Sequence, residues 1–230
     1  HHKKIASWRQ EESVKRTAAH RPDLLVQQPE MVAALAARTF VVLAHHPVLD
    51  RNGELVTTSV TNFDIHDIAR SCATFGVAGY YPVSPVRLQR EKIERIVEIW
   101  DREISQAGSE SRHQALGAIT VCSSLDSALR DIESRCKAKP WVVGTSAQIC
   151  RTRPQVGYRD LVAQRIAAQD VPLVLVLGTG WGLHESAFAL CDEVLTPVQG
   201  PYDYNHLSVR SALATILDRL FANRSGGPVR

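Results

Sequence analysis

The sequence predicts an α/β fold: a parallel-sheet α/β/α sandwich with a short helical extension in front of it. Two observations predict this fold. From Thr39 onward, short apolar runs alternate with longer amphipathic segments, as in successive β-α-β units. Before Thr39 the chain shows helical patterns only. With 230 residues and a hydrophobic content of 44%, the chain is long enough to bury one substantial core.

The N-terminal extension is expected to be helical. Residues 5–20 contain no proline or glycine, and the residue before Pro22 disfavours a helical backbone, so a first helix should end there. An alanine-rich stretch at 31–37 follows, as a connector or a docking helix. We therefore expect an extension over 1–38, one main domain over 39–222 and a disordered tail over 223–230.

The main domain should contain six short strands and at least three helices. Strands are expected at 40–44, 77–81, 118–121, 141–143, 173–177 and 194–196. A long helix is indicated by apolar residues at helical spacing, namely Ile93, Ile96, Val97, Trp100 and Ile104. The last helix should bury Leu213, Ile216, Leu217, Leu220 and Phe221.

Composition limits the function. The net charge of +3 comes from residues 1–38, which hold seven Lys/Arg and four Asp/Glu, while Arg151–Arg165 is a second basic stretch. Such an excess permits contact with a polyanion. The five cysteines form no C-x-x-C pair, so reduced thiols are expected, not a zinc site or disulfides. No apolar run is long enough for a membrane span, and the N-terminus does not resemble a signal peptide. We therefore expect a soluble, cytoplasmic protein.

The strongest functional pattern is an apolar strand at 173–177 that runs into Gly178, Gly180 and Gly182. Glycines at alternate positions allow a tight turn, so that a ligand can lie against peptide groups. A dinucleotide-binding loop is the alternative. It requires G-x-G-x-x-G, however, and here Trp181 blocks the approach of a pyrophosphate.

Two polar segments accompany the glycine loop. Residues 195–212 lead from a short strand into the last helix, and Asn205, His206 and Ser208 are expected at its N-terminus, where caps and anion contacts form. Residues 58–70 predict a helix from Asn62 that carries His66 and Arg70 on one face. A surface ion pair between Asp67 and Arg70 is the simpler explanation of the latter pattern.

Together these segments resemble the SPOUT superfamily of S-adenosylmethionine-dependent RNA methyltransferases, through Gly178–Leu183 and Asn205–Arg210, over about residues 39–222. The resemblance implies a C-terminal trefoil knot, with the cofactor bent among three loops at 144–147, 178–183 and 195–207. The contacts it implies are with Thr145, Ser146, Ala147, Leu177, Gly178, Thr179, Gly180, Trp181, Gly182, Leu183, Thr196, Pro197, Val198, Asn205, His206, Leu207 and Ser208.

The segment around Asn62 is similar to the first motif of the ribose 2′-O-methylating branch, in which an asparagine and a later arginine act on the acceptor hydroxyl. Asn62 and Arg70 are accordingly the first candidates for the acceptor side, with His206, Asp203 and Arg210 as second candidates. The third motif departs from that branch, since it reads His206-Leu-Ser-Val where S-L-N-V is usual. Ribose 2′-O and guanine N1 therefore both stay open as target atoms.

Residues 5–25 resemble the C-terminal tail of bacterial tRNA (guanine-N1)-methyltransferase, which implies RNA, and most plausibly tRNA, as partner. The alternative is a knotted RNA-binding module without catalysis, fused to that enzyme. SPOUT domains generally dimerise through the knot helices, so a homodimer is implied. No metal is expected, because a sulfonium methyl group needs no Lewis acid, and His45-His46 have no carboxylate at metal spacing.

Overall fold

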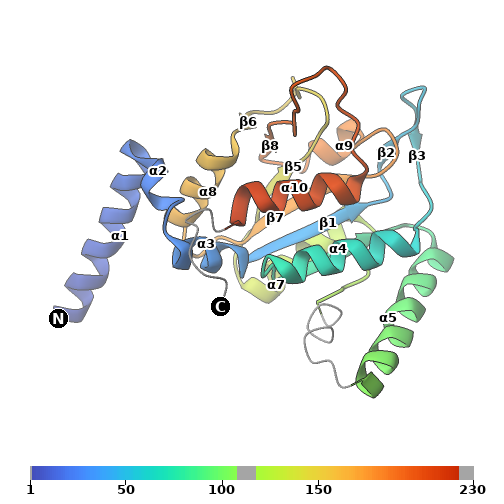
Figure 1. The fold of residues 1–230 in the computed structure, drawn as a ribbon, viewed down its shortest axis with the longest axis horizontal. Coiled ribbons are helices and arrows are strands. Elements are labelled where there is room, and N and C mark those ends of the chain that lie inside the picture. Colours follow the sequence, from blue (N-terminus) through green and yellow to red (C-terminus); the bar gives the residue numbers. More distant parts are fainter. Residues whose placement is uncertain (1, 108–117, 223–230) are drawn as a thin grey trace.

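The structure is a computed structural model that describes residues 2–107 and 118–222 (Figure 1). Six strands form one sheet in the order β4-β1-β7-β5-β8-β6, and every pairing within it is parallel. The strands are β1 Thr39–Ala44, β4 Gly79–Val83, β5 Trp141–Gly144, β6 Gln155–Val156, β7 Leu173–Gly178 and β8 Glu193–Leu195. The predicted parallel α/β sheet is confirmed.

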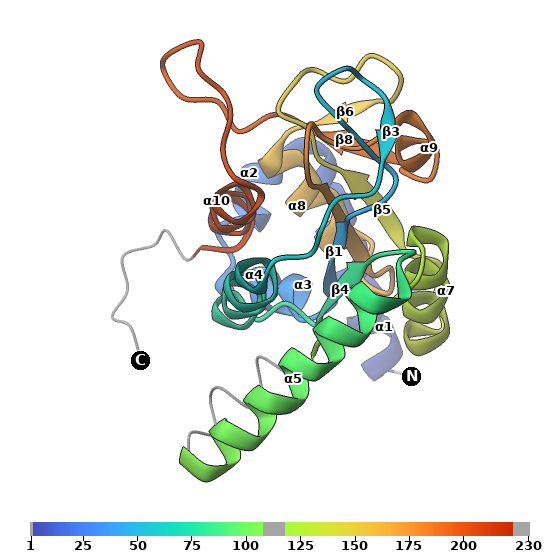
Figure 2. The same ribbon diagram turned by 90° about the vertical axis from the view of Figure 1, so that its right-hand side faces the viewer.

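Helices cover both faces of this sheet. Their bounds are α1 His2–His20, α2 Pro22–Leu25, α3 Pro29–Ala36, α4 Asn62–Thr74, α5 Arg87–Ala107, α7 Leu125–Cys136, α8 Tyr158–Ala167, α9 Glu185–Phe188 and α10 Val209–Phe221. Val41 and Leu43 of β1 pack into a core with α3, α4, α8 and α10, whereas Val42 and Ala44 pack with α7 and α9. Figure 2 shows α4 and α10 on one side of the sheet and α7 and α9 on the other. Successive strand residues point to opposite faces, so an apolar strand such as β1 fits between two helix layers.

The helix patterns read from the sequence correspond to the packing. Leu213, Ile216, Leu217, Leu220 and Phe221 are the buried residues of α10, as predicted. In α5, Ile93 is buried, and the side chain of Ile104 lies outside the described residues. The stretch 118–121, expected as a strand, lies parallel to β4, with Ile119 opposite Tyr80 and Cys122 opposite Val83. Ala118 O accepts from Tyr80 N–H at 2.8 Å, and Thr120 N–H donates to Tyr80 O at 2.9 Å.

The N-terminal extension is anchored to the sandwich. Val14 of α1 and Leu25 of α2 are both 4% exposed and belong to the main core. The first half of α1 instead leaves Ile5 and Trp8 exposed, and Figure 1 shows it extending away from the sheet. The expected tail at 223–230 lies outside the described residues.

The cysteines are free thiols: Cys72, Cys122 and Cys191 are buried and Cys136 and Cys150 are partly exposed. Burial raises the pKa of Cys72 to about 12, so its thiol stays protonated. Among the described helices, none combines the length and the apolar character that crossing a lipid bilayer requires.

Candidate functional site

Three loops predicted to hold the cofactor leave the same edge of the sheet. They follow β5, β7 and β8, which are neighbours in the sheet, and the carboxyl ends of parallel strands meet at one edge. Figure 1 shows these loops gathered at the top of the molecule. The first and third loops are in direct contact, because Asn205 Nδ2 donates to the carbonyl of Ala147 at 2.7 Å. The fold therefore brings the three segments together.

The glycine loop, residues 178–183, is paired with a hairpin that sequence reasoning did not predict. The hairpin consists of β2 (Val48–Leu49) and β3 (Leu55–Val56). Trp181 N–H donates to Leu49 O at 3.0 Å, and Leu49 N–H donates to Gly182 O at 2.9 Å. Part of the loop's main chain thus bonds to the protein itself, whereas the sequence interpretation reserved the loop's peptide groups for a ligand.

The three glycines of the loop serve different purposes. A Cβ at Gly178 would lie 2.8 Å from Leu183 N, and one at Gly180, where φ is +61°, would lie 2.8 Å from Leu49 O. These two glycines let the loop pack against its own protein. Gly182 has a φ of +108° and is half-buried, yet a Cβ there would meet nothing within 4 Å. The open space beside its peptide group fits a ligand held by main-chain contacts, as S-adenosylmethionine would be.

A chain of polar side chains links the end of β1 to the glycine loop. His45, at the end of β1, is fully buried and places Nδ1 3.0 Å from the hydroxyl of Thr58. That hydroxyl contacts the hydroxyl of Thr179, which in turn donates to Ala44 O at 3.3 Å. If Nδ1 carries the proton, each group in this chain donates to the next, which is the tautomer we assign. Burial lowers the pKa of His45 to about 4, so the ring is neutral.

The other residues of the first two loops differ in how far their side chains are buried. Leu177 and Leu183 are 2% and 3% exposed and pack in the two cores, so only their main chains are available to a ligand. In the first loop, Thr145 donates its hydroxyl to Val176 O at 3.1 Å and Ser146 Oγ accepts from Gln148 N–H at 3.0 Å. Both of these side chains are half-buried and stay at the edge of the sheet.

The third loop is more exposed. Thr196, Pro197 and Val198 are half-buried where it leaves β8, whereas Asp203, His206 and Leu207 are exposed. The expected capping by Asn205 is not seen. Ser208 caps α10, with Oγ accepting from Ser211 N–H at 3.3 Å, and Asn205 instead reaches the first loop. The reason is that the helix begins four residues after Asn205, at Val209.

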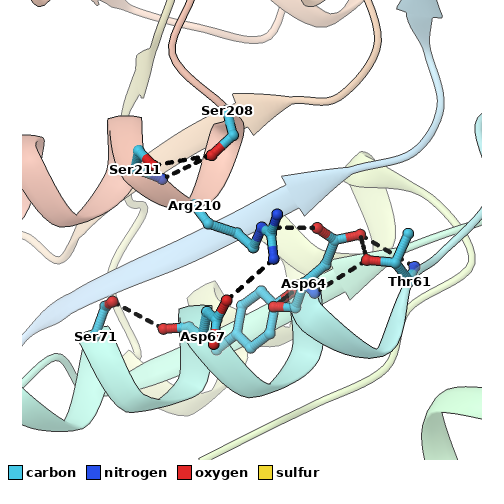
Figure 3. Close-up of polar contacts among 8 residues, drawn as sticks. Thr61, Asp64, Asp67, Ser71, Ser208, Arg210 and Ser211 are labelled. Atoms are coloured by element: carbon cyan, nitrogen blue, oxygen red, sulfur yellow. Dashed lines mark hydrogen bonds and ion pairs between the residues drawn. The ribbon is translucent and has the colours of Figure 1, made fainter.

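Arg210 joins the beginning of α10 to α4 (Figure 3). Its Nη1 donates to Asp67 Oδ2 at 3.1 Å, and its Nε lies 4.0 Å from Asp64 Oδ1. Asp64 is 7% exposed and also completes the capping box of α4 with Thr61. The guanidinium of Arg210 lies over the ring of Phe63 at 5.2 Å. Asp67 is therefore paired with Arg210, not with Arg70 as the simpler sequence interpretation suggested.

Asn62 and Arg70 lie at different heights on α4. The helix begins at Asn62 as predicted, and Asn62 is exposed at the loop-bearing edge of the sheet. Arg70 is eight residues further on, which is roughly 12 Å along the helix axis. It lines an open hollow of about 310 Å³ with Asp67, Ser71, Thr74 and Phe75. Thus Asn62 lies at the first turn of α4, and Arg70 lies about two turns further along the same helix.

This arrangement matches a known family. Residues 38–222 match the family of SAM-dependent RNA methyltransferases. The chain belongs to this family. The methyltransferase interpretation is thereby supported, with S-adenosylmethionine as the family's cofactor, and the non-catalytic alternative is not favoured.

Two relatives show how much of the chain is shared. A tRNA (guanine-N(1)-)-methyltransferase of Nitratidesulfovibrio vulgaris is 34% identical over 233 residues, which cover 96% of this chain and 53% of the relative. The chain therefore spans about half the length of that curated relative. An uncharacterised protein of Aquifex aeolicus is 36% identical over 183 residues, covering 80% of this chain and 88% of the relative.

Solved structures share the fold of this family member. TrmJ from Z. mobilis superposes with a TM-score of 0.51 at 16% identity, over 84% of this chain and 72% of that one. The SpoU methyltransferase AviRb from Streptomyces viridochromogenes gives 0.51 at 17% identity, over 83% and 61%. At such identities the likeness concerns the fold alone. It confirms the predicted α/β fold with a parallel sheet.

Sequence reasoning missed some residues that build the candidate site. Neither His45 nor Thr58 was assigned a part in holding the glycine loop, because the contact between Thr58 and Thr179 joins segments more than 120 residues apart. Asp64 was also missed, although Thr61 followed by an acid three residues later is a capping-box pattern that the sequence contains.

The structure also describes the basic stretch Arg151–Arg165 and the side chains that could bind a metal ion. Of the basic stretch, Arg165 is buried and stacks over Trp141 at 4.3 Å, and Arg153 donates to Ala189 O at 2.8 Å. Arg151 and Arg159 are exposed. Over residues 2–107 and 118–222, no group of three or more His, Cys, Asp or Glu side chains could hold a metal ion.

Proposed function

We propose that this chain transfers the methyl group of S-adenosylmethionine to RNA, and that its substrate is a tRNA. The observation that carries the proposal is the convergence of the three loops after β5, β7 and β8, with open space beside the Gly182 peptide. The tRNA assignment is supported by relatives named tRNA (guanine-N(1)-)-methyltransferase, which align over 96% of the chain.

The chemistry asks little of the side chains beyond placement. When bound, the cofactor supplies a methyl group already activated by its sulfonium, and the acceptor must lie in line with it. The first loop, through Thr145 and Ser146, and the second loop, through the Gly182 peptide, would hold the cofactor. The His45–Thr58–Thr179 chain fixes the second loop, because each of its polar groups is held by the next. A fixed loop reduces the positional freedom of the donor.

The acceptor side should be formed by polar residues at the same edge. Asn62 begins α4 there, and His206 and Asp203 are exposed on the third loop. Asn62 and His206 can each donate or accept a hydrogen bond with an RNA hydroxyl or base, and the carboxylate of Asp203 can accept one. Arg210 is tied to Asp67, so we assign it to holding the third loop's helix in place. Arg70 stays a candidate that reaches the acceptor from the hollow on α4.

Three further properties belong to this proposal. The segment 195–208 threads as a trefoil knot, supported by the contact of Asn205 with Ala147 across the first loop. The protein is a homodimer that pairs through the knot region and the exposed face of α10. It works in the cytoplasm, a reducing compartment in which free thiols such as Cys150 are usual.

The test combines binding with transfer. Isothermal calorimetry with S-adenosylhomocysteine measures the cofactor site, and tritiated S-adenosylmethionine with bulk tRNA and bulk ribosomal RNA measures transfer. We expect binding and labelling of the tRNA, and mass spectrometry of its nucleosides then separates 1-methylguanosine from a 2′-O-methylated nucleoside. Absence of both binding and labelling would refute the proposal. Binding without labelling of any RNA would leave the chain as a non-catalytic module.

A further inference from the structure

We infer that Trp181 is a stacking platform for an unpaired base of the RNA substrate, so that the enzyme selects nucleotides outside a continuous duplex. The inference rests on the proposed function and adds a substrate class to it. It also gives Trp181 a different role from the cofactor contact that the sequence resemblance implied.

The exposure of Trp181 is imposed by a fixed backbone. Its side chain is 68% exposed, although its N–H bonds to Leu49 O at 3.0 Å. The glycines on either side have φ values of +61° and +108°, and the first of them packs against Leu49 O. The loop is therefore held at Trp181, and the indole points away from the core. An exposed indole on a fixed backbone offers a flat aromatic surface on which the ring of a ligand can stack.

The position of Trp181 suits a base next to the methyl donor. It lies in the loop between Gly178 and Leu183. The open space at Gly182 is one residue away, and Thr179, whose hydroxyl contacts Thr58, is two residues away. On its other side, the loop is bonded to hairpin β2–β3, which stands at the same edge of the sheet (Figures 1 and 2). A base stacked on the indole would therefore lie beside the donor site, where the methyl acceptor must be.

The ligand chemistry follows from how proteins bind RNA. The bases of a duplex are stacked and out of reach, whereas unpaired bases in loops and bulges stack on exposed aromatic side chains. Such stacking contributes about 1–3 kcal/mol per base. The side chain of Trp181 is exposed, whereas Gly182 is half-buried. We therefore assign the indole to the RNA and the Gly182 peptide to the cofactor.

The experiment compares Trp181→Ala and Trp181→Phe with Trp8→Ala, which removes a tryptophan of similar exposure (59%) on α1. Two probes are used: a fluorescein-labelled single-stranded oligoribonucleotide, and the same strand annealed to its complement. Fluorescence anisotropy measures the binding of each probe. S-adenosylhomocysteine affinity is measured by calorimetry on each variant. We expect Trp181→Ala to weaken single-strand binding about 5- to 150-fold, the range that corresponds to the stacking energy of one base. Trp181→Phe should keep most of the affinity, and cofactor and duplex affinity should not change.

Unchanged single-strand binding by Trp181→Ala would overturn the inference. So would loss of S-adenosylhomocysteine affinity in that variant, since it would assign the indole to the cofactor. Equal losses in Trp8→Ala would also overturn it, because they would show an effect not specific to the loop. If the wild type transfers no methyl group to any RNA, the proposed function fails, while the anisotropy result still decides whether Trp181 stacks on unpaired bases.

Discussion

Replacing Gly180 by alanine should destabilise the protein through one identified contact. An alanine at the φ of +61° costs about 1–2 kcal/mol. Its Cβ would also lie 2.8 Å from Leu49 O, a backbone atom that cannot rotate away. The loop and hairpin must then separate, which weakens the bonds that link Leu49 to Trp181 and Gly182, at about 0.5–1.5 kcal/mol each. The expected loss of unfolding free energy is about 3 kcal/mol, or about 6–12 °C in Tm.

Gly76→Ala is the matched control. Gly76 has a φ of +70°, and a Cβ there would meet nothing within 4 Å, so it carries the backbone strain alone. The entropy that alanine removes from the unfolded chain is the same in both variants and cancels in the comparison. Guanidinium chloride unfolding followed by circular dichroism gives both free energies. Calorimetry with S-adenosylhomocysteine should show weakened binding for Gly180→Ala only. Equal stability of the two variants would refute the reasoning from the Leu49 contact.

Three further predictions concern polar groups. Arg210→Ala should lower the unfolding free energy by about 1–2 kcal/mol, because it removes a cationic neighbour of the buried Asp64 carboxylate. Urea unfolding measures this loss, and Arg210→Lys should recover part of it. Burial depresses the pKa of His45 from 6.5 to about 4, so the unfolded chain holds the extra proton between these values. Stability should be full above about pH 6.5 and fall by about 3 kcal/mol as the pH drops to about 4, a slope that His45→Asn should flatten in urea titrations. Arg70→Ala should keep its affinity for S-adenosylhomocysteine and lose about two orders of magnitude in methyl transfer; a single-turnover rate equal to that of the wild type would remove Arg70 from the acceptor side.

Much of the fold could be predicted because it depends on local patterns. The buried stripe of α10 and the start of α4 at Asn62 follow from helical spacing and a capping residue, which act over a few residues. The stretch 118–121 was predicted as a strand from its apolar run, and its backbone bonds to β4 in a parallel register. The hairpin β2–β3 was missed because its strands are two residues long, too short for an alternating pattern.

The sequence by itself determined the family of this protein: Gly178–Leu183 and Asn205–Arg210 carry the resemblance to SAM-dependent RNA methyltransferases, and residues 38–222 match that family. Only the tertiary structure decided how the site is built. It pairs Trp181 with Leu49, Arg210 with Asp67, and Thr179 with Thr58. The physical reason is that hydrogen bonds and ion pairs between distant segments depend on where the strands end in space. Residue patterns act locally and carry no record of those distances.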